Sequence, residues 1–363
     1  MKITGVRSEI VPVPAEEPLA GALARQGGVR PTVVVEIETD AGITGVGFTF
    51  FGAALTGALR AAVDALGETC IGADPLAITA IRARAEAAAG GAGPGGIFTL
   101  ALAAIDIALW DIKGKEAGQP LWKLLGGDGR PVPTYASGAM MRELPLERAV
   151  EAAGRLVEAG FDQMKMQLAL PGDTTPAREV ERARLIRERV GPDVALMCDV
   201  NQRWRVDQAI AIGRRLEDVG FAWLEDATAH DDHAGLARIA AALATPLACG
   251  EYVYGIVPFR HMLEAGSLDI VMIDPFRAGG ITPWLKVAAL AEAFGLPVVS
   301  HLAPEIQVHL MGAIPNGLTV EYMPWSYRLF REVPWPKAGR LEMPSGPGLG
   351  LDLDRAAIAR LRA

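Results

Sequence analysis

The chain has 363 residues, of which 50% are hydrophobic and 21% are charged, and its formal net charge is −8. This is the composition of a globular protein that is long enough for one large core or two domains. The sequence contains no basic run or basic stripe, which argues against nucleic acid as a partner. No apolar run reaches the roughly 18 residues that a membrane-spanning helix needs, so we expect no association with a membrane.

The cysteines and the first residues of the chain indicate the cellular compartment. Cys70, Cys198 and Cys249 are scattered and odd in number, so they show neither a disulfide framework nor a CxxC metal-binding motif. The first residues, MKITGVRSEIVPVP, lack the apolar segment of a signal peptide. We therefore expect a cytoplasmic protein.

The first third of the chain mixes strands and helices. Residues 1–50 alternate in polarity like strands, and residues 32–48 predict a hairpin whose turn is Asp-Ala-Gly at 40–42. Residues 15–31 show no clear periodicity and predict a long loop, which is often functional. Residues 53–125 are alanine-rich and predict helices, which a glycine-rich loop at 90–96 interrupts. This loop lacks the lysine and hydroxyl of a phosphate-binding loop, so we interpret it as structural.

From residue 130 onward, short apolar runs alternate with amphipathic helical patterns. We predict eight strands within VPTYAS, QMKMQLAL, VALMCDVN, FAWLEDA, PLACGEYV, LDIVMID, PVVSHLA and LTVEYM. Strands that alternate with helices over about 200 residues favour parallel strands closed into a (β/α)8-type barrel. A doubly wound open sheet is the alternative. The end of the chain, GPGLGLDLDRAAIARL, predicts a turn, a short strand and a helix that pack back on the N-terminal part.

One charged residue stands inside an apolar strand. In FDQMKMQLAL, which begins at Phe161, alternation places Met164 and Met166 on one face and Lys165 and Gln167 on the other. A buried lysine costs free energy unless it has a partner or a task. A lysine that reaches water at the end of the strand is the simpler interpretation.

Successive predicted strands each carry one polar residue near their end. The separations between these residues are 34, 26, 26, 23, 27 and 20 residues, and the middle values match one strand–helix unit each. The carboxyl ends of barrel strands meet at one mouth, so side chains that are far apart in the sequence would converge there. The residues are Lys165, Asp199, Glu225, Glu251, Asp274, His301 and Glu321.

Three of these residues suggest a metal site. Asp199, Glu225 and Glu251 would repel one another at one mouth unless a cation lay between them. Carboxylate oxygens with room for water or substrate suit Mg²⁺. Zinc fits less well because no cysteine or histidine is among the three. A single acidic residue at a strand end is more often a helix cap, but three at near-equal spacing weaken that interpretation.

His301 and Asp274 end neighbouring predicted strands, which lie about 4.8 Å apart in a sheet. Asp274 could therefore accept a hydrogen bond from the imidazole, fix its tautomer and raise its basicity, which makes His301 a candidate general acid/base. Glu321 could donate a hydrogen bond to a developing oxyanion if neighbouring carboxylates kept it protonated. We interpret His309, in the helix after His301, as a packing or subunit contact.

Taken together, these motifs resemble the enolase superfamily and, within it, the mandelate racemase subgroup, over nearly the whole chain. AAIDIALWDIKGKEAGQPLWKLLGG resembles the helix that closes the family's first domain. DVNQRW, WLEDA and GEY resemble its metal-ligand segments, which places the ligands at Asp199, Glu225 and Glu251. IDPFRAGGITPWLKVAALAEAFGLPVVSHLAPE resembles the region of its His–Asp dyad, here His301 and Asp274.

The resemblance implies an α/β fold, a modified TIM barrel of the (β/α)7β type with an N-terminal α+β capping domain that the C-terminal tail completes. The implied limits are 1–128 for the capping domain, 129–325 for the barrel and 326–363 for the tail. Glu321 falls at the family's electrophilic glutamate. The family's 20s and 50s loops, which set substrate choice, correspond roughly to residues 15–30 and 48–56.

Two residues depart from the family pattern. Ala227 stands where proline usually follows WLED. The family often has Lys-x-Lys in its second strand, and this chain has Lys165, Met166 and Gln167 there. Lys165 matches the family's first lysine, which typically contacts the substrate carboxylate. The resemblance therefore implies that Lys165 is a catalytic residue. Gln167 occupies the position of the second base and cannot exchange a proton usefully near neutral pH.

The resemblance therefore implies Mg²⁺-dependent removal of the proton next to a carboxylate, through an enediolate, with His301 as base. A single base favours dehydration of an acid sugar to a 2-keto-3-deoxy acid. An epimerase, a racemase or a sugar-lactone or anhydro-sugar cycloisomerase is the alternative, and a non-catalytic binding protein is the remote one. We expect a small carboxylate substrate and a homo-oligomer. Candidate substrate-binding residues are Gln167, Asn201, Arg25, Arg30 and Arg203.

Overall fold

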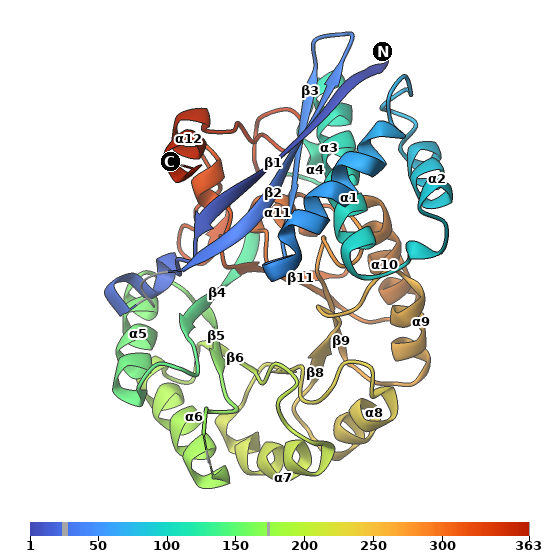
Figure 1. Cartoon of the computed structure of the whole chain (residues 1–363). Coiled ribbons are helices and arrows are strands. Elements are labelled where there is room, and N and C mark those ends of the chain that lie inside the picture. Colours follow the sequence, from blue (N-terminus) through green and yellow to red (C-terminus); the bar gives the residue numbers. More distant parts are fainter. Residues whose placement is uncertain (24–27, 173–174, 363) are drawn as a thin grey trace.

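The structure is a computed structural model, and it describes residues 1–23, 28–172 and 175–362. Figure 1 shows a ring of strands and helices below a smaller part that is built mainly from the N-terminal segment, in blue and teal. No helix of these residues is long and apolar enough to cross a membrane. Cytoplasmic location and a homo-oligomeric state stay predictions.

The N-terminal part is a three-stranded antiparallel sheet covered by helices. Its strand order is β1-β2-β3, and β2 pairs with β3 as the predicted hairpin. Its elements are β1 (Ile3–Pro14), β2 (Val29–Thr39), β3 (Thr44–Thr49), α1 (Thr56–Glu68), α2 (Ile78–Ala89), α3 (Gly96–Glu116) and α4 (Leu121–Leu124). The predicted loop at 15–31 is shorter than expected, because η1 (Pro18–Leu23) lies within it and β2 begins at Val29.

The apolar helix α3 forms the centre of this part. Most of its residues are buried, as expected for a helix that is apolar on all sides. It lies very close to β3, since a Cβ on Gly45 or Gly47 would collide with the backbone oxygens of Ala108 and Ala104. The glycines of TGVGF thus allow a strand and a helix to meet backbone to backbone.

The second part is a closed parallel barrel. Its strands are β4 (Val132–Met140), β5 (Gln163–Gln167), β6 (Ala195–Asp199), β7 (Leu224–Glu225), β8 (Leu247–Cys249), β9 (Ile270–Ile273), β10 (Val298–Ser300) and β11 (Gly317–Tyr322). They pair in sequence order, and β11 pairs with β4 to close the ring. All eight predicted strands are therefore confirmed, and the alternative of an open sheet is wrong.

Among the described residues, seven α-helices connect these eight strands, so the barrel is of the (β/α)7β type. They are α5 (Leu146–Glu158), α6 (Pro176–Val190), α7 (Val206–Leu216), α8 (His233–Ala242), α9 (Val257–Glu264), α10 (Ile281–Ala293) and α11 (Pro304–Met311). They surround the strands as an outer layer (Figure 1). Each helix buries its apolar face on the barrel, as α5 does with Ala149, Ala152 and Leu156.

The C-terminal segment returns to the N-terminal sheet. Helix α12 (Arg355–Arg362) contacts β1, and its Arg355 and Arg362 form ion pairs with Glu9 at 3.2 and 2.7 Å. The short strand predicted in GLGLDLD is wrong, because only Gly348 and Leu353 form bridges there, and each bridge is isolated. A two-residue strand, β12 (Arg340–Leu341), instead pairs with β4. The domain limits at 128 and 325 stay a prediction.

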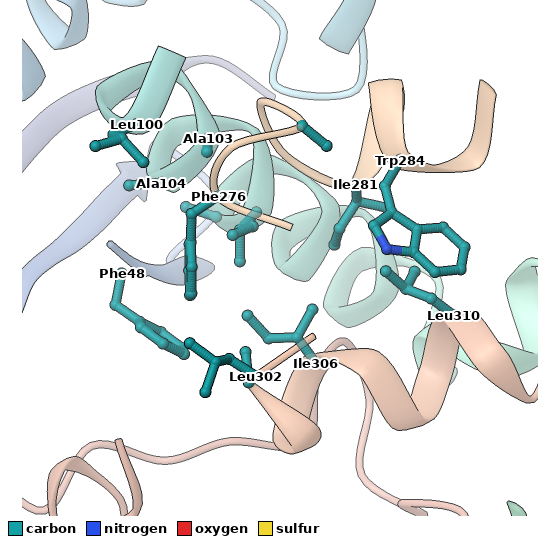
Figure 2. Close-up of a cluster of buried hydrophobic side chains, with 14 of the residues drawn as sticks. Phe48, Leu100, Ala103, Ala104, Phe276, Ile281, Trp284, Leu302, Ile306 and Leu310 are labelled. Carbon is teal, nitrogen blue, oxygen red and sulfur yellow. The ribbon is translucent and has the colours of Figure 1, made fainter. Parts of the chain in front are cut away.

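Apolar side chains join the two parts and fill the barrel. Figure 2 shows Leu100 and Ala103 of α3 facing Phe276, Leu302 and Ile306 of the barrel. Inside the barrel, Tyr135, Met197, Trp223, Met272 and Val299 form an apolar cluster with their neighbours. This cluster is the floor below the carboxyl ends of the strands, where the polar residues lie.

Candidate active site

The seven polar residues predicted at strand ends lie at one end of the barrel. Lys165, Asp199, Glu225 and Glu321 are within β5, β6, β7 and β11, whereas Asp274 and His301 directly follow β9 and β10. Glu251 lies two residues beyond β8. Gln167 is in register with Asp199, and Asp199 is in register with Glu225. All seven are buried, so the structure brings them together at the mouth of the barrel.

Lys165 lies between two carboxylates. Its Nζ is 2.5 Å from Glu225 Oε1 and 2.8 Å from Glu321 Oε1. Burial alone would lower the pKa of Lys165, but the charges of Glu225 and Glu321 outweigh it and hold the pKa well above its usual value. The lysine is therefore a buried ammonium with two partners, and the interpretation of a lysine that reaches water is wrong.

The three candidate metal ligands each have a different partner. Glu225 contacts Lys165 and also accepts a hydrogen bond from Trp223 Nε1 at 3.0 Å. Asp199 accepts from Gln167 Nε2 at 3.2 Å, and Glu251 Oε2 lies 3.3 Å from His301 Nε2.

Within the described ranges, no three His, Cys, Asp or Glu side chains lie close enough together to hold a metal ion as they stand. The chemistry of the three nevertheless fits a hard divalent cation, because Asp199, Glu225 and Glu251 lie on adjacent strand ends and offer only oxygen.

His301 and Asp274 form a hydrogen-bonded pair. The imidazole Nδ1 lies 2.8 Å from Asp274 Oδ2. The other oxygen of Asp274 accepts from the backbone N–H groups of Phe276 and Arg277 at 2.8 and 2.7 Å, which fixes the carboxylate. Burial lowers the pKa of His301, but Glu251 and Asp274 raise it further, to about 9. The Nε2 atom of this held imidazole faces the mouth of the barrel beside Glu251.

Glu321 is ionised in this arrangement. It contacts Lys165 and accepts a hydrogen bond from the backbone N–H of Leu302 at 2.7 Å. Burial raises its pKa, but Lys165 and His301 lower it more, to about 2. The expectation that neighbouring carboxylates keep Glu321 protonated is therefore not met, because Lys165 and His301 lower its pKa more than burial raises it.

Comparison with known proteins places this geometry in a family. The family described as "Enolase C-terminal domain-like" matches residues 148–357, and the "Mandelate racemase / muconate lactonizing enzyme, N-terminal domain" matches residues 6–126. The chain belongs to the mandelate racemase/muconate-lactonising enzyme subgroup of the enolase superfamily. It is an enzyme of that superfamily.

Relatives in this subgroup include acid-sugar dehydratases and cycloisomerases. The chain is 31% identical to the L-talarate/galactarate dehydratase of Salmonella typhimurium, over 98% of this chain and 90% of the relative. It is 35% identical to the 3,6-anhydro-alpha-L-galactonate cycloisomerase of Streptomyces coelicolor, over 91% of each chain. The L-talarate dehydratase of Polaromonas sp. JS666, solved with Mg and L-glucarate, superposes with a TM-score of 0.90 at 33% identity, over 99% and 96% of the two chains.

The predicted substrate-binding residues have different surroundings in this superfamily member. Gln167 Nε2 donates to Asn201 Oδ1 at 3.1 Å, as well as to Asp199, so both amides belong to the mouth. Arg30 lies at its edge, against Glu17. Arg203 is exposed, and among the described residues its side chain has no hydrogen bond. Arg25 lies outside the described residues.

Three residues at the mouth were not among the site residues predicted from the sequence: Arg142, Asp226 and Trp223. Arg142 Nη2 donates to Asn201 Oδ1 at 2.6 Å. Asp226 is buried, and neither of its carboxylate oxygens has a hydrogen-bond partner among the described residues. Trp223 could have been found, because it precedes Glu225 by two residues and shares its strand face.

Proposed function

We propose that this enzyme removes the proton next to the carboxylate of an acid sugar and expels the neighbouring hydroxyl group, which gives a 2-keto-3-deoxy acid. The observation that supports this most strongly is the asymmetry of the mouth. The imidazole of His301 follows β10, while Gln167 lies in β5, which is at least three strands away around the ring. The described residues thus offer a strong base on one side and a neutral amide on the other.

We propose that Asp199, Glu225 and Glu251 hold one Mg²⁺. When bound, the ion supplies positive charge beside the substrate carboxylate, where negative charge develops as the proton leaves. Lys165 contributes a second positive charge from the same wall, since its ammonium already contacts Glu225. The apolar floor below these groups excludes water and strengthens their electrostatic effect.

His301 has two tasks in this scheme. Glu251 is the charge that most raises the pKa of His301, and this effect is lost when Glu251 holds the ion. The neutral Nε2 then takes the α-proton, and Asp274 stabilises the resulting imidazolium through Nδ1. The imidazolium then gives this proton to the departing β-hydroxyl, which leaves as water, and the enol that remains tautomerises to the keto acid. One group can serve both steps only when the proton and hydroxyl leave from the same face of the substrate.

Cycloisomerisation is the second candidate, because the 35% identical relative from Streptomyces coelicolor is a cycloisomerase. The same residues could act on a substrate in which the departing oxygen belongs to a ring. His301 would then protonate a ring alkoxide, and no water would be lost.

A substrate screen in D₂O tests the proposal. Purified protein with Mg²⁺ is incubated with acid sugars and their lactones, and NMR follows keto-acid formation and deuterium at the α-carbon. We expect a keto acid from at least one acid sugar, and no turnover by His301→Asn. His261→Asn is the matched control, because His261 is exposed on α9. Ring opening without loss of water would establish the second candidate, and undiminished turnover by His301→Asn would refute both.

A further inference from the structure

Three side chains from distant parts of the chain form a group that we call the rim cluster: Glu17, Arg30 and Trp325. Arg30 Nη2 lies 3.3 Å from Glu17 Oε1, and Trp325 Nε1 donates to the same oxygen at 2.8 Å. The Arg30 guanidinium also stacks on the Trp325 ring, 3.7 Å from its centroid. The side chains of Glu17 and Arg30 are only 14% and 17% exposed, so they form a largely buried ion pair rather than a pair on the surface.

The rim cluster lies beside the mouth of the barrel. A Cβ on Gly138 of β4 would be 2.5 Å from Glu17 Oε2 and 3.2 Å from Met323 Cε, so Glu17 covers the ends of β4 and β11. In Figure 1 the blue helix η1, which follows β1, lies beside β4 and α5 of the barrel. The charge of Glu321 also contributes to raising the pKa of Glu17, which shows that the two carboxyl groups are near each other.

This position is opposite the candidate metal ligands. Asp199 and Glu225 belong to β6 and β7, and Glu251 follows β8, whereas the rim cluster covers the adjoining strands β4 and β11 across the ring. A substrate whose carboxylate lies at the ligands therefore directs its far end toward Glu17.

The charges of the rim cluster suit an uncharged group. Glu17 already neutralises Arg30, and Trp325 already occupies Oε1 of Glu17. Among the described residues Glu17 Oε2 accepts no hydrogen bond, so it can accept one from a hydroxyl. A second carboxylate would instead lie beside Glu17 and Glu321 in a partly buried space. Arg30 and Lys165 already balance these two charges, so the added negative charge would have no cation of its own.

We infer that the substrate has one carboxylate and that its far end is an uncharged polyhydroxyl chain or a lactone ring. The inference rests on the proposed function. A partly buried carboxylate without a cation of its own binds poorly, so we expect at least a roughly 100-fold preference for the monoacid over the matching diacid.

The test compares kcat/KM for a pair of substrates that differ only at the far end, such as galactonate and galactarate, with further pairs of other configuration. Burial raises the pKa of Glu17 to about 7, so assays at pH 8.5 keep its carboxylate ionised. We expect the wild-type enzyme to prefer the monoacid. Glu17→Gln removes the charge and should reduce that preference about tenfold, whereas Glu17→Asp keeps the charge and should preserve it.

Glu16→Gln is the matched control. Glu16 is the neighbouring carboxylate, but it is paired with Tyr327 and Arg328 and is 37% exposed, so its loss should leave the preference unchanged. A wild-type enzyme that prefers diacids, or a preference that Glu17→Gln does not alter, would overturn the inference while leaving the proposed function intact. Absence of turnover for every pair would refute the proposed function itself.

Discussion

Acidification should destabilise the fold through a single buried histidine, His309. It lies in α11 and connects the barrel to two other segments. The backbone N–H of Trp122 in α4 donates to its Nδ1 at 3.2 Å, so its Nε2 carries the proton and donates to the carbonyl of Leu349 at 3.1 Å. Both ring nitrogens are thus used by the neutral form, and a second proton on Nδ1 would face the Trp122 N–H. Burial lowers the pKa of His309 from 6.5 to about 4.

The free energy of unfolding should therefore fall between pH 6.5 and pH 4. Above pH 6.5 the histidine is neutral in the folded and unfolded chains, and its full contribution is present. Below pH 6.5 the unfolded chain binds a proton that the folded chain rejects until the pH approaches 4, so protonation favours unfolding. With pKa values of 6.5 and 4, the loss is roughly 2 kcal/mol at pH 5 and about 3 kcal/mol at pH 4.

Urea denaturation of the wild-type protein and His309→Gln over this pH range measures the effect. Glutamine offers an NH2 donor group and a carbonyl acceptor but does not titrate, while the remaining carboxylates contribute equally to both proteins. The stability of the wild-type protein relative to the variant should decline by these amounts as the pH falls. The exposed His261→Gln is the control and should show a constant difference from the wild type. If the difference in unfolding free energy between the wild type and His309→Gln also stays constant over this pH range, the reasoning is refuted.

Three further predictions concern the mouth of the barrel. His301→Asn should lower kcat by at least about 100-fold while calorimetry finds Mg²⁺ affinity within about twofold of the wild type; a parallel loss of Mg²⁺ binding would contradict a role in proton transfer alone. Glu225→Gln should weaken Mg²⁺ binding at least about tenfold in the same titration, and unchanged affinity would remove Glu225 from the ligand set. Gln167→Lys should add a base on the second face, detected by NMR as new α-deuterium exchange or an epimer of the substrate; no exchange beyond the wild-type level would show that Gln167 does not occupy the place of a base.

The barrel and the convergence of the seven polar residues could be predicted from the sequence, because both depend on local patterns. Alternation over a few residues identifies a strand and the faces of Lys165 and Met166. Parallel strands joined by helices then place their carboxyl ends at one mouth. Even Glu251, which lies two residues beyond its strand, follows from this rule.

The partners of these residues could not be predicted in the same way. The rim cluster joins Glu17 to Trp325, which is 308 residues away, and no periodicity connects the two. The tail is a similar case, since its LDLD alternation resembles a strand, but Leu353 forms only an isolated bridge to Phe330. Strand patterns indicate which face is buried, whereas tertiary packing decides which neighbour is available.

The surroundings of Lys165 bear on the choice between one base and two. Between Glu225 and Glu321 the lysine is held as an ammonium, and an ammonium can donate a proton or attract an anion but cannot accept a proton. Lys165 therefore suits contact with a substrate carboxylate better than proton removal. Gln167, two residues along the same strand face, cannot act as a base either. The wall formed by β5 thus offers charge and hydrogen bonds but no base, which supports our proposal that His301, across the ring, transfers the proton.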